Sequence, residues 1–159
     1  MAMIPPGGAA TYEAWLRRMG VRYVIVADAP ADYSSRDEAA LVSSGVTSLV
    51  PVAWTQHTTI YELPRATPLV TGPSPASVLY LYSSRVVFVT DGPGAYKVRL
   101  RWSPYWHAST GCATRTRDGM TRVTTSRAGL VELRFAVSVT RGLQTLAGTI
   151  PSCSKTADH

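Results

Sequence analysis

The residue types best suited to holding a ligand lie in one short segment, Tyr96 to Trp102. Cationic side chains occupy every second position of this segment, at Lys97, Arg99 and Arg101, with apolar residues between them. Period-two alternation is typical of a half-buried antiparallel strand, so the three cations are predicted to share its solvent face. Guanidinium groups bind phosphate and carboxylate oxygens in a bidentate manner. The segment therefore predicts either a surface that attracts anionic lipid headgroups, lipid-linked sugar phosphates or acidic glycans, or a basic face that is merely solvated.

Aromatic residues directly follow this segment and suit a second kind of contact. Pro104 is predicted to end the strand, which places Tyr105 and Trp106 near the rim of the fold with His107 beside them. Sugars bind proteins largely through the faces of aromatic rings, assisted by directed hydrogen bonds. These three residues are therefore candidate ligand-binding residues. Packing of the rings beneath the loop is the alternative.

The sequence contains no motif that predicts catalysis, a metal site or a cofactor site. It lacks a nucleophile elbow, a P-loop and a dinucleotide-binding glycine motif. The histidines, His57, His107 and His159, stand too far apart for a local zinc pattern. We therefore predict a domain without enzymatic activity that needs no metal or cofactor. A small enzyme assembled from distant carboxylates such as Asp118 and Glu132 is the alternative.

The two cysteines allow one disulfide bond. Cys112 lies in a polar segment rich in Ser, Thr and Gly, and Cys153 lies in a polar tail. Neither belongs to a Cys-x-x-Cys pair, which argues against a zinc site or a thioredoxin-type motif. Exposed free thiols are a liability outside the cytoplasm. We predict that Cys112 and Cys153 are joined; two isolated buried thiols are the alternative.

Composition is that of one small globular protein with a basic C-terminal part. The chain has 159 residues, 45% of them hydrophobic, and a formal net charge of +6. Up to Ala66 five basic and six acidic residues give −1, and from Thr67 eleven basic and four acidic residues give +7. No DNA- or RNA-binding motif accompanies this charge, so we expect no nucleic-acid partner. No apolar run approaches the ~20 residues of a membrane-spanning helix, and the first residues do not resemble a signal peptide.

Helix and strand signals place a small α/β cap at residues 11–66, after a disordered lead-in at 1–10. Tyr12, Trp15, Leu16 and Met19 lie on one stripe of a helix that Gly20 is expected to end. The remaining predicted elements of the cap are a strand at 21–26, a helix at 35–43 and a strand pair at 46–54 and 58–63.

Residues 76–140 are predicted to form an antiparallel, jelly-roll-like β-sandwich. It follows a proline-rich linker at 67–75 and precedes an irregular tail at 141–159. Asp118-Gly119 is a strong hairpin signal, because glycine adopts the positive φ of a tight turn. The predicted strands are 77–82, 85–91, 95–102, 105–108, 112–117, 120–125 and 129–140. The expected fold class is α+β, with two helices and about three strands followed by the sandwich.

Several short motifs resemble, in their order, one family of bacterial membrane proteins. They are Trp15-Leu16, GVRYVIV at 20–26, IYELPRA at 60–66, WSPYW at 102–106, Asp118-Gly119, RAG at 127–129 and VELRF at 131–135. Together they resemble the C-terminal soluble domain of YfhO-like and related actinobacterial polytopic membrane proteins, which are similar to polyprenyl-phosphate-sugar-dependent glycosyltransferases. The resemblance spans Trp15 to Phe135 and does not include the membrane-spanning helices of that family.

The resemblance implies an accessory domain. We expect a non-catalytic, extracytoplasmic and monomeric domain, tethered to the cell membrane through upstream segments, that binds a glycan, a lipid-linked sugar or an anionic lipid headgroup. The alternative is a structural domain that docks on the transmembrane region of the same protein. An exposed aromatic residue beside converging arginines would favour binding, whereas a broad apolar patch would favour docking.

Overall fold

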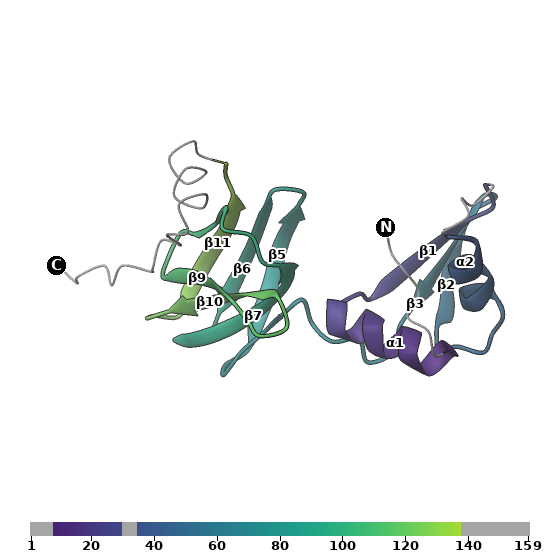
Figure 1. Ribbon diagram of the computed structural model, residues 1–159, viewed down its shortest axis with the longest axis horizontal. Coiled ribbons are helices and arrows are strands. Elements are labelled where there is room, and N and C mark those ends of the chain that lie inside the picture. Colours follow the sequence, from purple (N-terminus) through teal and green to yellow (C-terminus); the bar gives the residue numbers. More distant parts are fainter. Residues whose placement is uncertain (1–7, 30–34, 138–159) are drawn as a thin grey trace. The chain divides into compact units, whose positions relative to one another are not determined.

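The computed structural model describes residues 8–29 and 35–137. The chain divides after Pro68 into two compact units, which we call the N-terminal unit and the β-sandwich unit (Figure 1). Each has its own hydrophobic core. The expected α+β class is confirmed, because both described helices belong to the N-terminal unit and the described elements of the second unit are strands.

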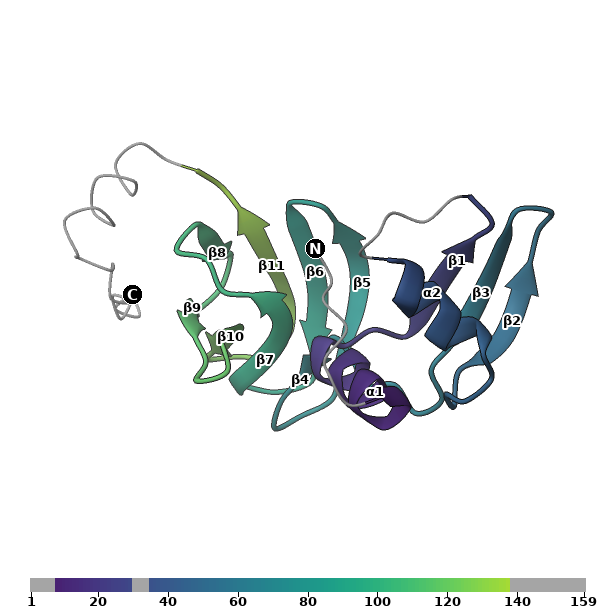
Figure 2. The same cartoon turned by 45° about the vertical axis from the view of Figure 1, so that its right-hand side comes forward.

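The N-terminal unit is a three-stranded antiparallel sheet with two helices packed on one face (Figure 2). Its elements are α1 (Gly8–Met19), β1 (Tyr23–Ala27), α2 (Arg36–Ser43), β2 (Val50–Trp54) and β3 (Thr58–Glu62). The central strand is β3, which pairs with both β1 and β2. Tyr12 and Leu16 of α1 and Val42 of α2 share one buried core with Leu49 and Leu63. Of the predicted helical stripe, α1 therefore buries Tyr12 and Leu16, while Trp15 packs partly buried against the same core and Met19 is half-buried.

Polar contacts hold both helices of this unit in place. The Tyr12 hydroxyl donates a hydrogen bond of 2.6 Å to Glu38 Oε1 of α2. Burial and the neighbouring Glu38 carboxylate raise the pKa of this phenol, so it remains a donor. At the other side of α1, Glu13 accepts hydrogen bonds of 2.6 Å from both the backbone N–H and the hydroxyl of Ser48. Hydrogen bonds from Ser48 lower the pKa of Glu13, so the carboxylate stays ionised.

The β-sandwich unit consists of two four-stranded antiparallel sheets. Its strands are β4 (Val70–Thr71), β5 (Ala76–Tyr82), β6 (Arg85–Thr90), β7 (Gly94–Arg101), β8 (Trp106–Ala108), β9 (Cys112–Arg115), β10 (Met120–Thr125) and β11 (Gly129–Phe135). One sheet has the order β4-β7-β10-β9 and the other β5-β6-β11-β8. Among these pairs only β5–β6 and β9–β10 join consecutive strands, so the chain crosses repeatedly between the sheets, as in jelly rolls and other Greek-key sandwiches.

The core of the sandwich follows the alternation seen in the sequence. Tyr96 and Val98 of β7 are fully buried and pack against residues from both sheets. The Tyr96 hydroxyl donates a hydrogen bond of 2.6 Å to the carbonyl oxygen of Gly92, so its polar end is satisfied inside the core. Gly72 is required beside this ring, because a Cβ there would lie 2.2 Å from Tyr96 Cδ1.

Several predicted boundaries differ from the structure; β2, for example, begins at Val50, so the strand predicted at 46–54 is too long. α1 begins at Gly8, inside the expected lead-in, because Ala9 and Ala10 are strong helix formers. β4 lies inside the expected linker, and a two-residue edge strand is too short to show a periodic pattern. β11 ends at Phe135, and Val137 is 71% exposed, so the predicted strand at 129–140 is too long. Residues 1–7, 138–140 and the predicted tail at 141–159 lie outside the described residues.

Candidate anion-binding groove

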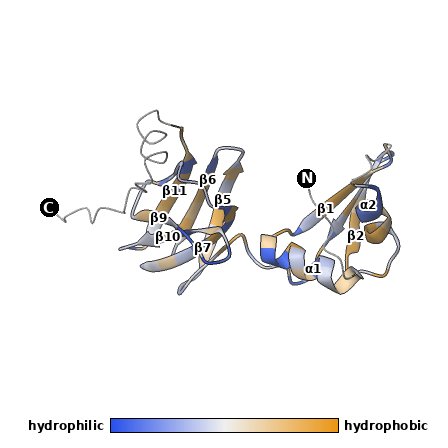
Figure 3. Ribbon diagram, in the orientation of Figure 1, coloured by the Kyte–Doolittle hydropathy of each residue, from blue (hydrophilic) through white to orange (hydrophobic). Residues whose placement is uncertain are grey.

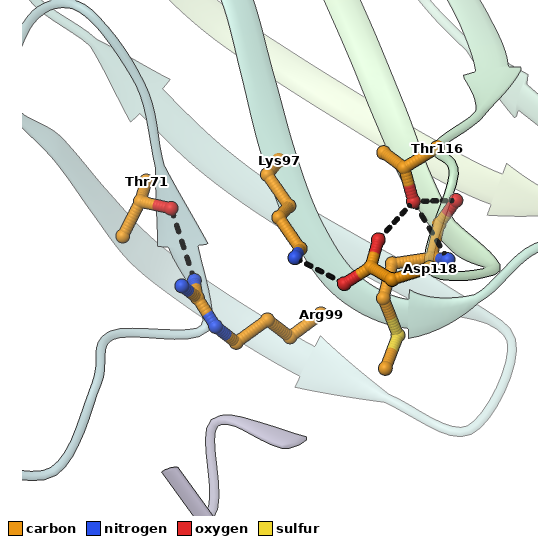
Figure 4. Close-up of polar contacts among 6 residues, drawn as sticks. Thr71, Lys97, Arg99, Thr116 and Asp118 are labelled. Atoms are coloured by element: carbon orange, nitrogen blue, oxygen red, sulfur yellow. Dashed lines mark hydrogen bonds and ion pairs between the residues drawn. The ribbon is translucent and has the colours of Figure 1, made fainter. Parts of the chain in front are cut away.

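The three cations predicted on β7 share a face but have different surroundings. Figure 4 shows two of them, Lys97 and Arg99. Lys97 points toward Asp118 and forms an ion pair with its Oδ2. The Arg99 side chain turns to Thr71, donating from Nη1 to Oγ1 at 3.0 Å, and burial lowers the pKa of its guanidinium. Arg101 is exposed at the end of the strand. The predicted basic face exists, but its members are not equally open to solvent.

Asp118 is held in place by the turn between β9 and β10. The Thr116 hydroxyl donates to Asp118 Oδ1 at 2.6 Å and accepts from the backbone N–H of Met120 at 2.8 Å. The hydrogen bonds from Lys97 and Thr116 lower the pKa of Asp118 to about 2. A fixed, ionised carboxylate therefore sits next to Lys97 at neutral pH.

A groove of about 690 Å³ opens beside this ion pair in the sheet β4-β7-β10-β9. Four cationic side chains line it, with Asp118 as the acidic one: Lys97, Arg115, Arg117 and Arg122. Lys97 and Arg122 are direct partners across the β7–β10 pair. Directly opposed residues of an antiparallel pair project to the same face, with Cβ atoms about 4.5–5.5 Å apart. The groove is therefore a concave surface of concentrated positive charge.

The arginines of this groove have no internal counter-ion within the described part of the chain. Arg115, Arg117 and Arg122 form no ion pair there. Arginines elsewhere do: Arg134 pairs with Glu132 at 2.8 Å, and Arg22 pairs with Glu62 at 2.9 Å. The groove consequently offers three guanidinium groups to an external anion.

Sequence reasoning did not identify the three groove arginines. They flank the predicted Asp118-Gly119 turn, so the hairpin signal marked the segment without indicating a site. What joins Arg122 to Lys97 is the pairing of β7 with β10, two strands separated in the chain by β8 and β9. No local pattern reports such a pairing.

The predicted aromatic residues belong to the opposite sheet. Tyr105 and Trp106 each meet the Phe135 ring edge to face, with centroid distances of 5.8 and 5.2 Å. Trp106 Nε1 donates to the carbonyl oxygen of Arg101 at 3.1 Å, and its ring packs against the sandwich core. These contacts correspond to the alternative in which the two rings pack within the fold. His107 lies in β8 and lines a separate cavity, so the structure does not bring the predicted aromatic and basic residues into one site.

Of the two cysteines predicted to form a disulfide bond, only Cys112 lies within the described residues. Cys112 begins β9 and does not carry a free thiol. Cys153 lies outside the described residues, so the pairing of the two cysteines stays a prediction.

Within residues 8–29 and 35–137, His, Cys, Asp and Glu form no cluster suited to holding a metal ion. Across the same residues, no helix has the length and apolar character needed to cross a membrane.

Large apolar residues are exposed on both units. Figure 3 shows the hydropathy of the residues along the ribbon. On the sheet face opposite the helices of the N-terminal unit, Tyr23, Ile25 and Val50 are 48%, 66% and 49% exposed. In the β-sandwich unit, the edge strand β5 exposes a run of apolar side chains: Val78, Leu79, Tyr80, Leu81 and Tyr82. These surfaces exceed the scattered single apolar residues of an ordinary surface.

Comparison of the chain with protein-family models, with curated proteins and with solved structures finds no match.

Proposed function

We propose that this chain is a non-catalytic, extracytoplasmic accessory domain of a larger, glycosyltransferase-like membrane protein, and that it binds an acidic glycan or a lipid-linked sugar. The observation that carries the proposal is the groove in which Arg115, Arg117 and Arg122 form no ion pair with any other residue that the structure describes. Concentrated positive charge in a concave surface raises the local concentration of anionic ligands. Guanidinium groups add bidentate hydrogen bonds to phosphate or carboxylate oxygens.

The surroundings of the carboxylates support a role without catalysis. Asp118 is held by Lys97 and Thr116, and Glu132 is held by Arg134. Asp118 lies in the turn between β9 and β10 of one sheet, whereas Glu132 lies in β11 of the other sheet. The lowered pKa of Asp118 makes this carboxylate a weak general base at neutral pH. The distant-carboxylate enzyme therefore has less support than the accessory domain.

Binding by the full chain to acidic and neutral oligosaccharides tests the proposed function. We expect the acidic ligands to bind at low ionic strength and to be released as salt rises, because the Debye length falls to about 10 Å at 0.1 M. Arg122→Gln should weaken this binding about tenfold, the scale of one lost charge-assisted hydrogen bond. Arg127→Gln removes the same charge from an exposed loop outside the groove and should leave the affinity unchanged.

Two results would contradict a binding function of the groove. One is the absence of binding to every anionic ligand at low ionic strength. The other is equal weakening by Arg122→Gln and Arg127→Gln, since that result would mean that net charge, and not the groove, attracts the ligand.

Docking on the transmembrane region of the same protein is a second candidate, favoured by the apolar sheet face around Ile25. In the intact membrane protein, a docked face would be shielded from water. Ile25→Glu should then loosen the domain and speed its release by protease, whereas Arg122→Gln should not. Equal protease sensitivity of Ile25→Glu and the parent would contradict docking through this face.

A further inference from the structure

We infer that the ligand group held in the groove is a phosphate, and that Asp118 is an internal counter-ion which the phosphate displaces from Lys97. This inference rests on the proposed binding function and specifies its chemistry. It is argued from the arrangement of charge around the turn that joins β9 and β10.

The first observation is a pair of like charges placed directly opposite each other. Lys97 and Arg122 are cross-strand partners, and like charges in this arrangement destabilise a sheet. Asp118 is the acidic side chain that lines the groove, and its carboxylate contacts Lys97. The carboxylate therefore occupies a position beside Lys97 that an anionic ligand would take.

The second observation is the convergence of guanidinium groups on the same turn. Arg101 Nη1 and Arg115 Nη2 lie 3.8 and 3.9 Å from the point where a side chain at Gly119 would begin. Arg117 precedes Asp118 directly in the turn and also lines the groove. Donors from β7 and β9 thus approach Gly119, the residue that follows Asp118, and Arg117 of the same turn lines the groove.

The charge balance of the groove favours a phosphate over a carboxylate ligand. Four cationic side chains and one carboxylate line it, which leaves a net charge of +3. A ligand carboxylate would bring one negative charge, no more than Asp118 already provides. A phosphate monoester brings a charge of roughly −1.5 to −2 and three acceptor oxygens, which match donors arriving from several strands.

The size of the groove indicates that the phosphate is part of a larger ligand. Its volume of about 690 Å³ exceeds that of a phosphate group. Small-molecule sites typically have volumes of about 300–1,000 Å³. The groove therefore has room for a sugar or a lipid headgroup attached to the phosphate.

Displacement needs no large rearrangement of the turn. When the phosphate contacts Lys97 Nζ, Asp118 keeps its hydrogen bond from the Thr116 hydroxyl, which is 2.6 Å long. The lysine side chain carries rotatable donors and exchanges one anionic partner for another. Asp118 thus competes with the ligand, and its removal should strengthen binding.

The test is a titration of the full chain with inorganic phosphate, pyrophosphate and glucuronate, followed by NMR and calorimetry at low ionic strength. Phosphate and pyrophosphate should bind more tightly than glucuronate and shift the resonances of Arg115 and Arg122. Asp118→Asn should tighten pyrophosphate binding about fivefold, the effect of one charge about 4 Å away in a solvent-like medium. The turn should survive, because Asn-Gly is as favourable there as Asp-Gly.

The matched control is Glu132→Gln, which removes one negative charge from the opposite sheet and should not tighten binding. Arg122→Gln should weaken pyrophosphate binding about tenfold, while Arg127→Gln should not. Vesicles of phosphatidylcholine with and without phosphatidic acid, whose headgroup is a phosphate monoester, distinguish the sources. Selective retention by phosphatidic acid that Arg122→Gln abolishes indicates a lipid headgroup, and pyrophosphate binding without vesicle retention indicates a soluble or sugar-linked phosphate.

The inference and the proposed function fail in different ways. Glucuronate binding as tightly as pyrophosphate, or unchanged pyrophosphate affinity in Asp118→Asn, would overturn the inference and leave anion binding intact. Equal tightening by Asp118→Asn and Glu132→Gln would also overturn it, because the effect would then follow net charge. Absence of binding to all three anions would overturn both.

Discussion

At the scale of single residues, the ion pair between Lys97 and Asp118 controls the charge of the groove. Hydrogen bonds from Lys97 and Thr116 lower the pKa of Asp118 to about 2, below the ordinary value for aspartate in an unfolded chain. A lowered native pKa stabilises the fold at pH values above the unfolded pKa. That contribution is lost as the pH falls from about 4 toward 2, because the carboxylate takes up a proton.

We therefore predict that the pKa of Asp118 depends on Lys97. In Lys97→Gln, the pKa should rise toward its ordinary value, because the largest cause of the shift is removed. A carbon-detected NMR titration of the side-chain carboxyl group measures both values. Glu13, whose pKa is lowered by hydrogen bonds from Ser48 in the N-terminal unit, should titrate identically in both proteins. An unchanged Asp118 pKa in Lys97→Gln would mean that Thr116 alone causes the shift.

A second residue-scale prediction concerns Tyr96, which is fully buried and donates to the Gly92 carbonyl oxygen. Tyr96→Phe keeps the ring but leaves a buried acceptor without its partner. The free energy of unfolding should fall by about 1–3 kcal/mol. Tyr80→Phe is the control, since Tyr80 is 57% exposed, and it should change stability by less than about 0.5 kcal/mol. Chemical denaturation of the three proteins measures the difference, and equal stabilities would contradict a structural role for the hydroxyl.

At the scale of elements, two glycines with the same backbone conformation separate backbone strain from steric overlap. Gly111, before β9, has a φ of 76°, and Gly119, in the β9–β10 turn, has a φ of 78°. A Cβ at Gly111 would lie 1.8 Å from the carbonyl oxygen of Thr124, whereas a Cβ at Gly119 meets only arginine side-chain ends at ordinary distances. A side chain at Gly119 therefore has room in the turn, whereas a side chain at Gly111 would overlap the backbone of β10.

Gly119→Ala should cost about 1–2 kcal/mol, the price of a left-handed conformation for a residue with a Cβ. Gly111→Ala should cost about 2–5 kcal/mol, because an overlap with backbone adds to that strain and no rotamer relieves it. Thermal unfolding followed by circular dichroism compares the two variants directly. Equal destabilisation would show that the close approach at Thr124 relaxes freely.

The elements also decide where the predicted ligand residues lie. β7 belongs to one sheet and β8 to the other, so Lys97 and Trp106 face different surroundings although few residues separate them in the chain. β7 ends at Arg101, before Pro104, so the strand predicted at 95–102 stops one residue earlier than expected. The chain then crosses to the second sheet, where Phe135 packs against Tyr105 and Trp106.

At the scale of the whole molecule, positive charge is segregated into the sandwich part of the chain. Residues up to Ala66 carry a net charge of −1 and those from Thr67 carry +7. A surface charged in this way attracts anions over distances set by the Debye length. The groove is a concave part of this positively charged surface. We therefore expect ligand binding to depend strongly on the salt concentration.

The disulfide bond is the prediction that connects distant parts of the chain. Non-reducing mass spectrometry should show Cys112 and Cys153 joined, and Cys112→Ser should lower the free energy of unfolding by about 2–4 kcal/mol. Reduction of the unmodified protein should reproduce the same loss. Alkylation of two thiols in the native, unreduced protein would contradict the bridge.

Local sequence patterns determined the elements and the faces of the strands. The alternation around Tyr96 and Val98 correctly predicted a strand with those two side chains in the core, and Asp118-Gly119 correctly predicted a turn. Gly20 ends the first helix region with a positive φ of 71°. These features depend on backbone sterics and on period-two or period-3.6 burial, which neighbouring residues specify.

Only the tertiary structure decided which strands pair and therefore which side chains meet. Lys97 lies opposite Arg122 because β10 pairs with β7, and Trp106 meets Phe135 because β8 pairs with β11. Period-two patterns specify the face of a strand but not its neighbour, and several partners satisfy the same pattern. The choice is made by collective packing of two sheets around one core, and the groove is a consequence of that choice.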